Sequence, residues 1–202
     1  MIEEGAKAPD FTMPTDGGGE VSLAALAGKT VVLYFYPRDD TPGCTKEACA
    51  FRDLHPALEK LDAVVIGVSK DSVAAHDKFK AKYDLNFPLA ADTDGAVCEA
   101  YGVWVEKNMY GRKSMGIERS TFLIDRDGVL RKEWRGVKVK GHADEVLEAD
   151  EIRDRGGPAG WVARCIKSGR AGAVYAGALR RPNFGTRTCP DMAGPNFLGS
   201  SS

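Results

Sequence analysis

Two short apolar segments joined by a helical pattern constrain the fold more than any other feature of this sequence. Residues 30–36 (TVVLYFY) and 64–69 (VVIGVS) are nearly unbroken runs of β-branched, aromatic and aliphatic side chains. Such runs are typical of strands that are buried on both faces. Between them, apolar residues recur at helical steps of three or four, at Ala48, Phe51, Leu54, Leu58 and Leu61. This order predicts a βαβ unit with two parallel strands.

The rest of the first 149 residues alternates between the same two kinds of pattern. The turn sequence Asp125-Arg126-Asp127-Gly128 between two apolar segments predicts a β-hairpin. We therefore predict an α/β fold with a central mixed β-sheet flanked by helices. The further elements expected are helices at residues 73–83, at 95–101 and from 141–142 onward, with strands at 87–91, 120–124 and 129–134.

Composition changes near residue 150. Gly and Pro make up 20 of the first 149 residues but 13 of the last 53, and the net charge changes from −5 to +4. Asp150 and Glu151 stand where apolar residues would continue the last helix, which we expect to weaken it. We predict a domain at residues 1–149, followed at 150–202 by a Gly/Arg/Pro-rich extension that is disordered or non-native. A basic interaction arm is the alternative for this extension.

The overall charge and hydropathy argue against several classes of protein. A net charge of −1 gives the chain no general attraction for nucleic acid or for an anionic membrane. The longest apolar runs are too short to cross a bilayer. Residues 1–11 contain Glu3, Glu4 and Lys7 but no apolar stretch of the kind found in a secretory signal. We therefore expect a cytoplasmic protein with no nucleic-acid or membrane partner.

The cysteine pattern excludes further classes. The chain has five cysteines and no C-x-x-C pair, which argues against a secreted disulfide framework, a zinc ribbon and a dithiol reductase. The three histidines share no ligand-like spacing with one another or with the cysteines, so we expect no metal site. The residues concerned are Cys44, Cys49, Cys98, Cys165, Cys189, His55, His76 and His142.

Cys44 is placed where a thiol becomes reactive. Thr41 is a favourable helix N-cap and Pro42 a favourable first helical residue, so Cys44 is expected in the first turn of the helix. The free backbone N–H groups and the helix dipole at this point favour an anion, here a thiolate. Ligands of open α/β sheets also bind outside the carboxyl ends of the strands, which is where this helix begins. The alternative is that Cys44 is a small buried apolar residue.

Cys49 lies five residues further along the same predicted helix. Five helical residues correspond to a rise of about 7.5 Å, which separates the Cα atoms by more than a disulfide allows. A disulfide between Cys44 and Cys49 therefore requires the first turns of the helix to unwind. The alternative is a spectator thiol on the flank of the helix.

Four blocks of sequence, in order, resemble one known family. Residues 41–53 (TPGCTKEACAFRD) resemble the active-site helix of peroxiredoxins of the bacterioferritin-comigratory-protein, or peroxiredoxin Q, group. Residues 5–11 (GAKAPDF) resemble its opening, 110–125 (YGRKSMGIERSTFLID) a later active-site strand, and 137–142 (VKVKGH) its closing segment. The resemblance covers about residues 3–149, and residues 150–202 have no counterpart in it.

The resemblance implies a thioredoxin-like fold and the reduction of hydrogen peroxide or organic hydroperoxides. Carried over residue by residue, it makes Cys44 the peroxidatic cysteine, which becomes a sulfenic acid. Thr41 and Pro37 would shape its pocket, and Arg119 would supply the essential cation. Cys49 would resolve the sulfenic acid as an intramolecular disulfide, which thioredoxin or a similar thiol reductant would reduce. The resemblance also implies a monomer without a cofactor.

Two other functions remain compatible with the sequence. One is a one-cysteine peroxidase, in which an external thiol resolves the oxidised Cys44. The other is a redox sensor or chaperone-like binder with the same fold and little turnover. Cys98 lies in a predicted helix beside apolar residues, and we expect it to serve packing.

Overall fold

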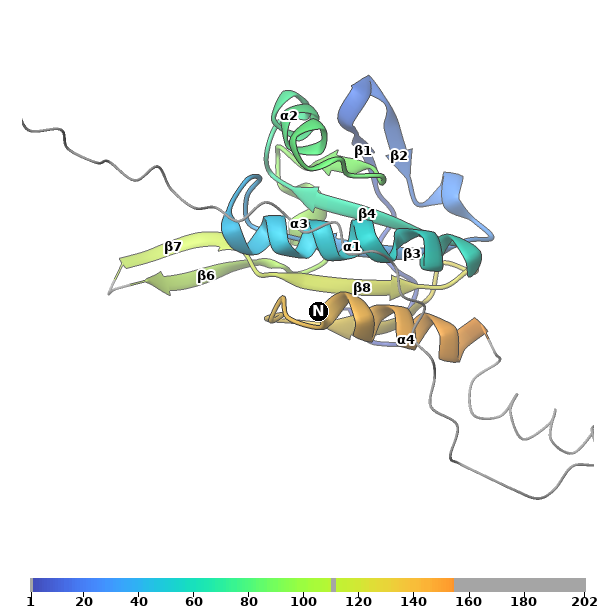
Figure 1. Cartoon of the computed structure of the whole chain (residues 1–202). Coiled ribbons are helices and arrows are strands. Elements are labelled where there is room, and N and C mark those ends of the chain that lie inside the picture. Colours follow the sequence, from blue (N-terminus) through green and yellow to red (C-terminus); the bar gives the residue numbers. More distant parts are fainter. Residues whose placement is uncertain (1, 110–111, 155–202) are drawn as a thin grey trace, which may run out of the picture.

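A five-stranded β-sheet forms the centre of the molecule (Figure 1). The computed structural model describes residues 2–109 and 112–154. The strands lie in the order β5-β4-β3-β8-β9, with parallel pairing from β5 to β3 and antiparallel pairing from β3 to β9. They are β3 (Thr30–Phe35), β4 (Ala63–Ser69), β5 (Leu89–Ala91), β8 (Ser120–Ile124) and β9 (Leu130–Trp134). The predicted mixed sheet is confirmed.

Helices cover both faces of this sheet (Figure 1). On one face, side chains of three helices form a core with Val32 and Tyr34 of β3. On the other face, a shorter helix forms a second core with Leu33 and Phe35. Because side chains alternate along a strand, β3 is buried on both sides, as its unbroken apolar sequence indicates. The three helices on the first face are α1 (Pro42–Lys60), α2 (Val73–Tyr83) and α4 (His142–Asp154), and the shorter helix on the second face is α3 (Ala96–Ala100).

Two pairs of strands lie outside the predicted pattern. Both are antiparallel ribbons separate from the central sheet, and neither shows a sustained apolar run or a clean alternation. The first pair is β1 (Thr12–Pro14) and β2 (Glu20–Ser22), with the 3₁₀ turns η1 (Asp16–Gly18) and η2 (Ala24–Leu26) after each strand. The second pair is the hairpin of β6 (Trp104–Met109) and β7 (Arg112–Ile117). Elements that are not buried between helices carry no strong hydrophobic signal.

Helix α4 runs past the domain limit predicted at residue 149 and continues to Asp154. Asp150 is fully buried in the last part of this helix. The expectation that Asp150 and Glu151 weaken the end of the helix stays a prediction. The predicted limit falls inside a helix, and the rest of the predicted extension, from residue 155 onward, lies outside the described residues. Within the described ranges, no helix is long and apolar enough to cross a bilayer.

Gly67 on β4 and Tyr34 on β3 are paired across the sheet and provide a test of this core. A Cβ atom at residue 67 would lie 2.7 Å from Oη of Tyr34 and 2.9 Å from Cδ2 of Leu89. We expect Gly67→Ala to lower the free energy of unfolding by about 1–3 kcal/mol, which is typical of an overpacked core. Urea denaturation followed by circular dichroism measures this change.

Tyr34→Phe is the matched variant. The Tyr34 hydroxyl is buried and has no hydrogen-bond partner among the described residues, so its removal should have little effect on stability. Phenylalanine lacks Oη but keeps Cζ, which would lie 2.8 Å from the new methyl group, so Gly67→Ala should be only slightly less destabilising in the Tyr34→Phe background. A larger loss in the Tyr34→Phe background would contradict this account of the packing.

Candidate active site

The carboxyl end of β3 and the amino end of β8 meet at one edge of the sheet. Residues 36–41 connect β3 to α1, and β8 runs antiparallel to β3 with Phe35 opposite Ser120. Arg119 directly precedes β8, so it lies beside the segment that follows β3. This strand pairing brings two distant parts of the sequence to the start of α1.

Cys44 is the third residue of α1, as its sequence context predicts. Thr41 is the N-cap, Pro42 opens the helix, and the N–H group of Thr45 donates the first helical bond to the Thr41 carbonyl at 2.8 Å. The N–H groups that precede Thr45 in this turn have no helical carbonyl to bind, and the helix dipole places positive potential there. The Cys44 side chain is a free thiol and is 2% exposed.

Arg119 binds the sulfur of Cys44 directly. Its Nη2 atom donates a hydrogen bond to Sγ at 3.1 Å, while Nη1 pairs with the carboxylate of Glu47. A Cβ atom at residue 43 would lie 3.4 Å from Nη2, an ordinary contact distance, so the guanidinium packs against the start of the helix. Burial lowers the pKa of Arg119, but Glu47 and Cys44 outweigh this effect and raise it above its ordinary value. The guanidinium is therefore charged beside the thiol.

Glu47 is a site residue that the sequence analysis missed. It lies three residues after Cys44, on the same face of α1, and is 1% exposed. Burial raises the pKa of its carboxyl to about 7, although the charge of Arg119 and the bond to Arg119 oppose this shift. The signal available in the sequence was an acidic residue one helical turn from the candidate nucleophile.

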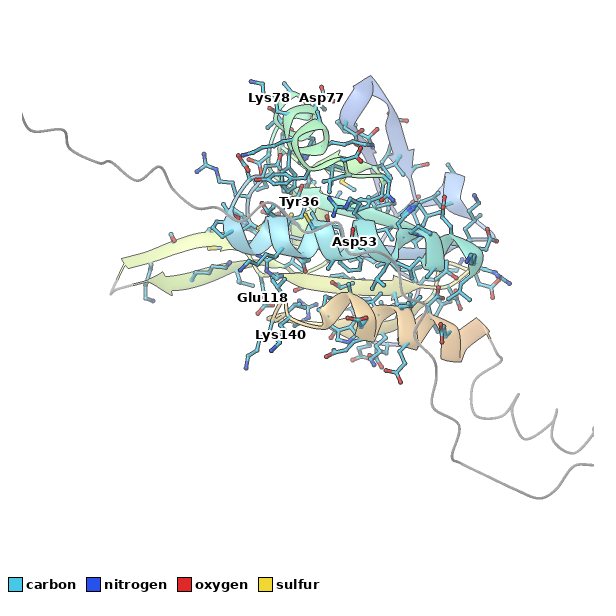
Figure 2. The ribbon with its side chains drawn as sticks, in the orientation of Figure 1. Tyr36, Asp53, Asp77, Lys78, Glu118 and Lys140 are labelled. Carbon is cyan, nitrogen blue, oxygen red and sulfur yellow. The ribbon has the colours of Figure 1, made fainter. Side chains whose placement is uncertain are left out.

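A hydrogen-bond network anchors the segment between β3 and α1. The Tyr36 hydroxyl donates to Oδ1 of Asp39 at 2.7 Å. Nδ1 of His76, on α2, is hydrogen-bonded to Oδ2 of Asp39 at 2.8 Å. The Asp39 N–H group donates to Asp71 at 2.7 Å, and the Tyr83 hydroxyl donates to Asp40 at 2.6 Å. Figure 2 labels Tyr36 between α1 and α2. The start of α1 is thus tied to α2 and to the end of β4.

Thr41 and Pro37, which the resemblance assigns to the pocket, both lie in this segment. The Thr41 hydroxyl donates to the Arg38 carbonyl at 3.1 Å and makes no capping bond to α1. Pro37 is exposed. Of the five residues expected at the site, the structure brings Cys44 and Arg119 into direct contact.

The other described cysteines differ from Cys44. Cys49 is buried on α1 and takes part in a disulfide, although not with Cys44, which is free. Cys98 is fully buried, and burial followed by its contact with Asp92 raises the pKa of its thiol far above the ordinary value. The packing role expected of Cys98 therefore fits its surroundings. Cys165 and Cys189 lie outside the described residues.

His142 begins α4 and is buried. Its Nε2 atom lies 2.7 Å from Oγ1 of Thr121. Burial, with the charge of Arg119 as a second cause, lowers the pKa of His142 to about 4, so the ring is neutral. Across residues 2–109 and 112–154, no three His, Cys, Asp or Glu side chains are grouped to hold a metal ion.

Comparison with known proteins identifies chains similar to this one. The AhpC/TSA family model matches residues 5–133. Peroxiredoxin Bcp of Bacillus subtilis is 55% identical over 147 residues, which are 73% of this chain and 94% of that protein. The structure of Xanthomonas campestris bacterioferritin comigratory protein, solved in work on its alkyl peroxide reduction activity, has a TM-score of 0.71 at 46% identity, covering 75% of this chain and 99% of that one. The structure of a cysteine-to-serine variant of PrxQ from Xylella fastidiosa has a TM-score of 0.73 at 40% identity, with coverages of 76% and 98%.

The buried carboxyl of Glu47 predicts a specific dependence of stability on pH. Between its ordinary pKa of 4.5 and the folded value of about 7, the unfolded chain releases a proton that the folded chain keeps. The stabilisation from this group is therefore complete below pH 4.5 and is lost as the pH rises through 7. We expect the stability of the wild type relative to Glu47→Gln to fall by about 1–3 kcal/mol over this range.

Urea denaturation of both proteins between pH 4.5 and 8 tests this prediction. Glu148→Gln is the control, because Glu148 is exposed on α4. Parallel stability curves for the wild type and Glu47→Gln would show that Glu47 is not held protonated by burial.

Proposed function

This chain belongs to the AhpC/TSA family, as a peroxiredoxin of the Bcp and peroxiredoxin Q group, and we propose that peroxide oxidises it at Cys44. The observation that carries this proposal is the 3.1 Å hydrogen bond from Arg119 to the Cys44 sulfur at the start of α1. A cation and free helix N–H groups together favour the thiolate, which is the reactive form of cysteine. Hydrogen peroxide and organic hydroperoxides are the proposed substrates.

In the proposed reaction, the Cys44 thiolate attacks the terminal oxygen of the hydroperoxide. A sulfur–oxygen bond forms while the oxygen–oxygen bond breaks, and the sulfur gives up two electrons to become a sulfenic acid. The second oxygen leaves as an alkoxide or hydroxide and takes a proton from solvent, which yields an alcohol or water. The peroxide is reduced by the same two electrons.

Arg119 stabilises the charge that moves during this step. Its guanidinium has five N–H donors, and the two contacts with Cys44 and Glu47 leave others for the peroxide oxygens. Preorganised donors of this kind stabilise the negative charge on the leaving oxygen. The Thr41 hydroxyl can bind the peroxide in the same turn, and Pro37 offers no N–H group there.

Cys49 is the proposed resolving residue. Once the disulfide that Cys49 makes in this structure is reduced, its thiolate attacks the Cys44 sulfenic acid. Hydroxide leaves and takes a proton to become water, and the disulfide between Cys44 and Cys49 forms. The two residues are about 7.5 Å apart along an intact helix, so the first turn of α1 must unwind for this bond to form. Thioredoxin or a similar dithiol then reduces the disulfide. An intramolecular bond needs no second subunit, which supports a monomer, and a reducible disulfide suits a cytoplasmic location.

Cysteine variants separate this mechanism from its alternatives. We expect Cys44→Ser to abolish peroxide consumption, and Cys49→Ser to reduce thioredoxin-supported turnover on the order of 10²-fold while it leaves the first oxidation intact. After one equivalent of peroxide, the fully reduced wild type should lose about 2 Da and Cys49→Ser should gain about 16 Da. Intact mass with peptide mapping measures both changes.

Cys98→Ser is the control, because Cys98 is buried away from the proposed chemistry. Unchanged turnover in Cys49→Ser would assign resolution to an external thiol. Peroxide consumption that stops after one equivalent, even with reductant present, would favour a sensor over a peroxidase.

We also propose that the peroxidase requires only the fold that ends with α4. The predicted limit at residue 149 removes the last part of this helix and the buried Asp150, whereas a limit at Asp154 keeps both. A chain that ends at Asp154 should retain the melting temperature and turnover of the full chain within error, and a chain that ends at residue 149 should melt several degrees lower, as a loss of about 1 kcal/mol would cause. Loss of turnover in the chain that ends at Asp154 would support the interaction-arm alternative.

A further inference from the structure

The hairpin of β6 and β7 leads directly into the active site. It extends away from the central sheet, next to the end of the molecule where α1 begins (Figure 1). β7 ends at Ile117, and only Glu118 separates it from Arg119. Figure 2 labels Glu118 at the foot of this hairpin. A side chain of the hairpin that points toward Glu118 therefore approaches Arg119, where the peroxide is proposed to bind.

Lys107 is such a side chain. It belongs to β6, and its Nζ atom donates a hydrogen bond to the Ile117 carbonyl at 2.5 Å. A Cβ atom at residue 116 would lie 3.3 Å from Cδ of Lys107, so the lysine lies across Gly116 on its way to the foot of the hairpin. Gly116 does not have a positive φ, so its small size and not its backbone freedom serves this contact. The glycine makes room for the lysine.

Lys113, across the same hairpin, shows the contrasting arrangement. Its side chain is 71% exposed and pairs with Glu106 at 2.8 Å, as is usual for a surface lysine. Lys107 is only partly exposed, and within the described part of the chain no carboxylate lies within 4 Å of its Nζ atom. The remaining donors of Lys107 are therefore open to solvent or to an anion that displaces it.

The charges around Lys107 are those of the active site. Burial lowers its pKa, and the positive charge of Arg119 lowers it further, while Glu118 and Cys44 partly oppose these effects. Lys107 therefore lies within electrostatic range of the reactive sulfur and its arginine, and its bond to the Ile117 carbonyl holds Nζ two residues before Arg119. Arg119 is already engaged by Cys44 and Glu47, whereas two of the three Nζ protons of Lys107 remain available.

We propose that Lys107 binds an anionic group on the substrate, and that this peroxidase prefers hydroperoxides that carry a carboxylate near the peroxide group. This inference rests on the proposed function of Cys44 and adds a substrate class to it. Arg119 acts on the reacting oxygens, and Lys107 acts on the remainder of the molecule. Lys107 thus determines specificity.

A pair of substrates that differ only in charge tests this inference. 4-Hydroperoxy-4-methylpentanoate and its methyl ester present the same tertiary hydroperoxide, with and without a carboxylate. The measured quantity is the second-order rate constant for oxidation of Cys44 in the reduced full-length chain, from rapid acid quench and mass spectrometry. We expect the wild type to prefer the carboxylate, and Lys107→Gln to lower the ratio of the two rate constants by about tenfold, the effect of one charge-assisted hydrogen bond.

Two further variants exclude a purely structural effect. Lys107→Arg keeps the charge and should retain most of the preference, and Lys113→Gln, on the same hairpin, should leave the ratio unchanged. The preference of the wild type should also fall as salt is added. A ratio near one in the wild type, or the same ratio in the wild type and in Lys107→Gln, would overturn the inference while oxidation of Cys44 still supported the proposed function. If neither substrate nor hydrogen peroxide oxidised Cys44, both proposals would fail.

Discussion

The contact that Arg119 makes with both Cys44 and Glu47 is the interaction on which the chemistry of this structure depends. It requires the antiparallel pairing of β3 with β8, because that pairing brings residue 119 to the start of α1. The guanidinium also packs against the first turn of α1 at Gly43. The pairing of β3 with β8 and the start of α1 therefore together place Arg119, Cys44 and Glu47 as one group of interacting charges.

Glu47 has two opposing effects in this unit. Its carboxylate holds one edge of the guanidinium and so orients the edge that reaches the sulfur. Its negative charge, however, would work against a thiolate one helical turn away. Burial lessens this conflict, because it raises the pKa of the carboxyl to about 7 and leaves Glu47 protonated in part of the molecules at neutral pH. Lys107 adds a second positive charge within electrostatic range of Cys44, and Glu118 adds a negative charge beside Lys107.

The parts of the fold that are set by burial could be predicted from sequence, and the parts set by distant pairing could not. α2 was predicted at its observed ends, and β3 and β4 within one residue, because packing between layers imposes their apolar patterns. The position of Cys44 in its helix followed from local capping residues. Arg119 followed only from family resemblance, since it lies 75 residues from Cys44 and no local pattern marks it. Lys107 depends on a solvent-facing hairpin that has no hydrophobic signal.

The start of α1 must hold Cys44 for attack on peroxide and then release it toward Cys49, and its local structure suits both steps. The first turn lacks a capping bond from the Thr41 side chain, a bond that typically contributes about 1 kcal/mol to a helix. Cys44 also precedes the first residue that donates a helical hydrogen bond, Thr45, so displacing it breaks few backbone bonds. The Asp39 network fixes the segment before this turn, and the buried Phe51 fixes α1 beyond it. Unwinding is therefore confined to the short stretch between two anchored regions, which is the stretch that carries the reactive sulfur.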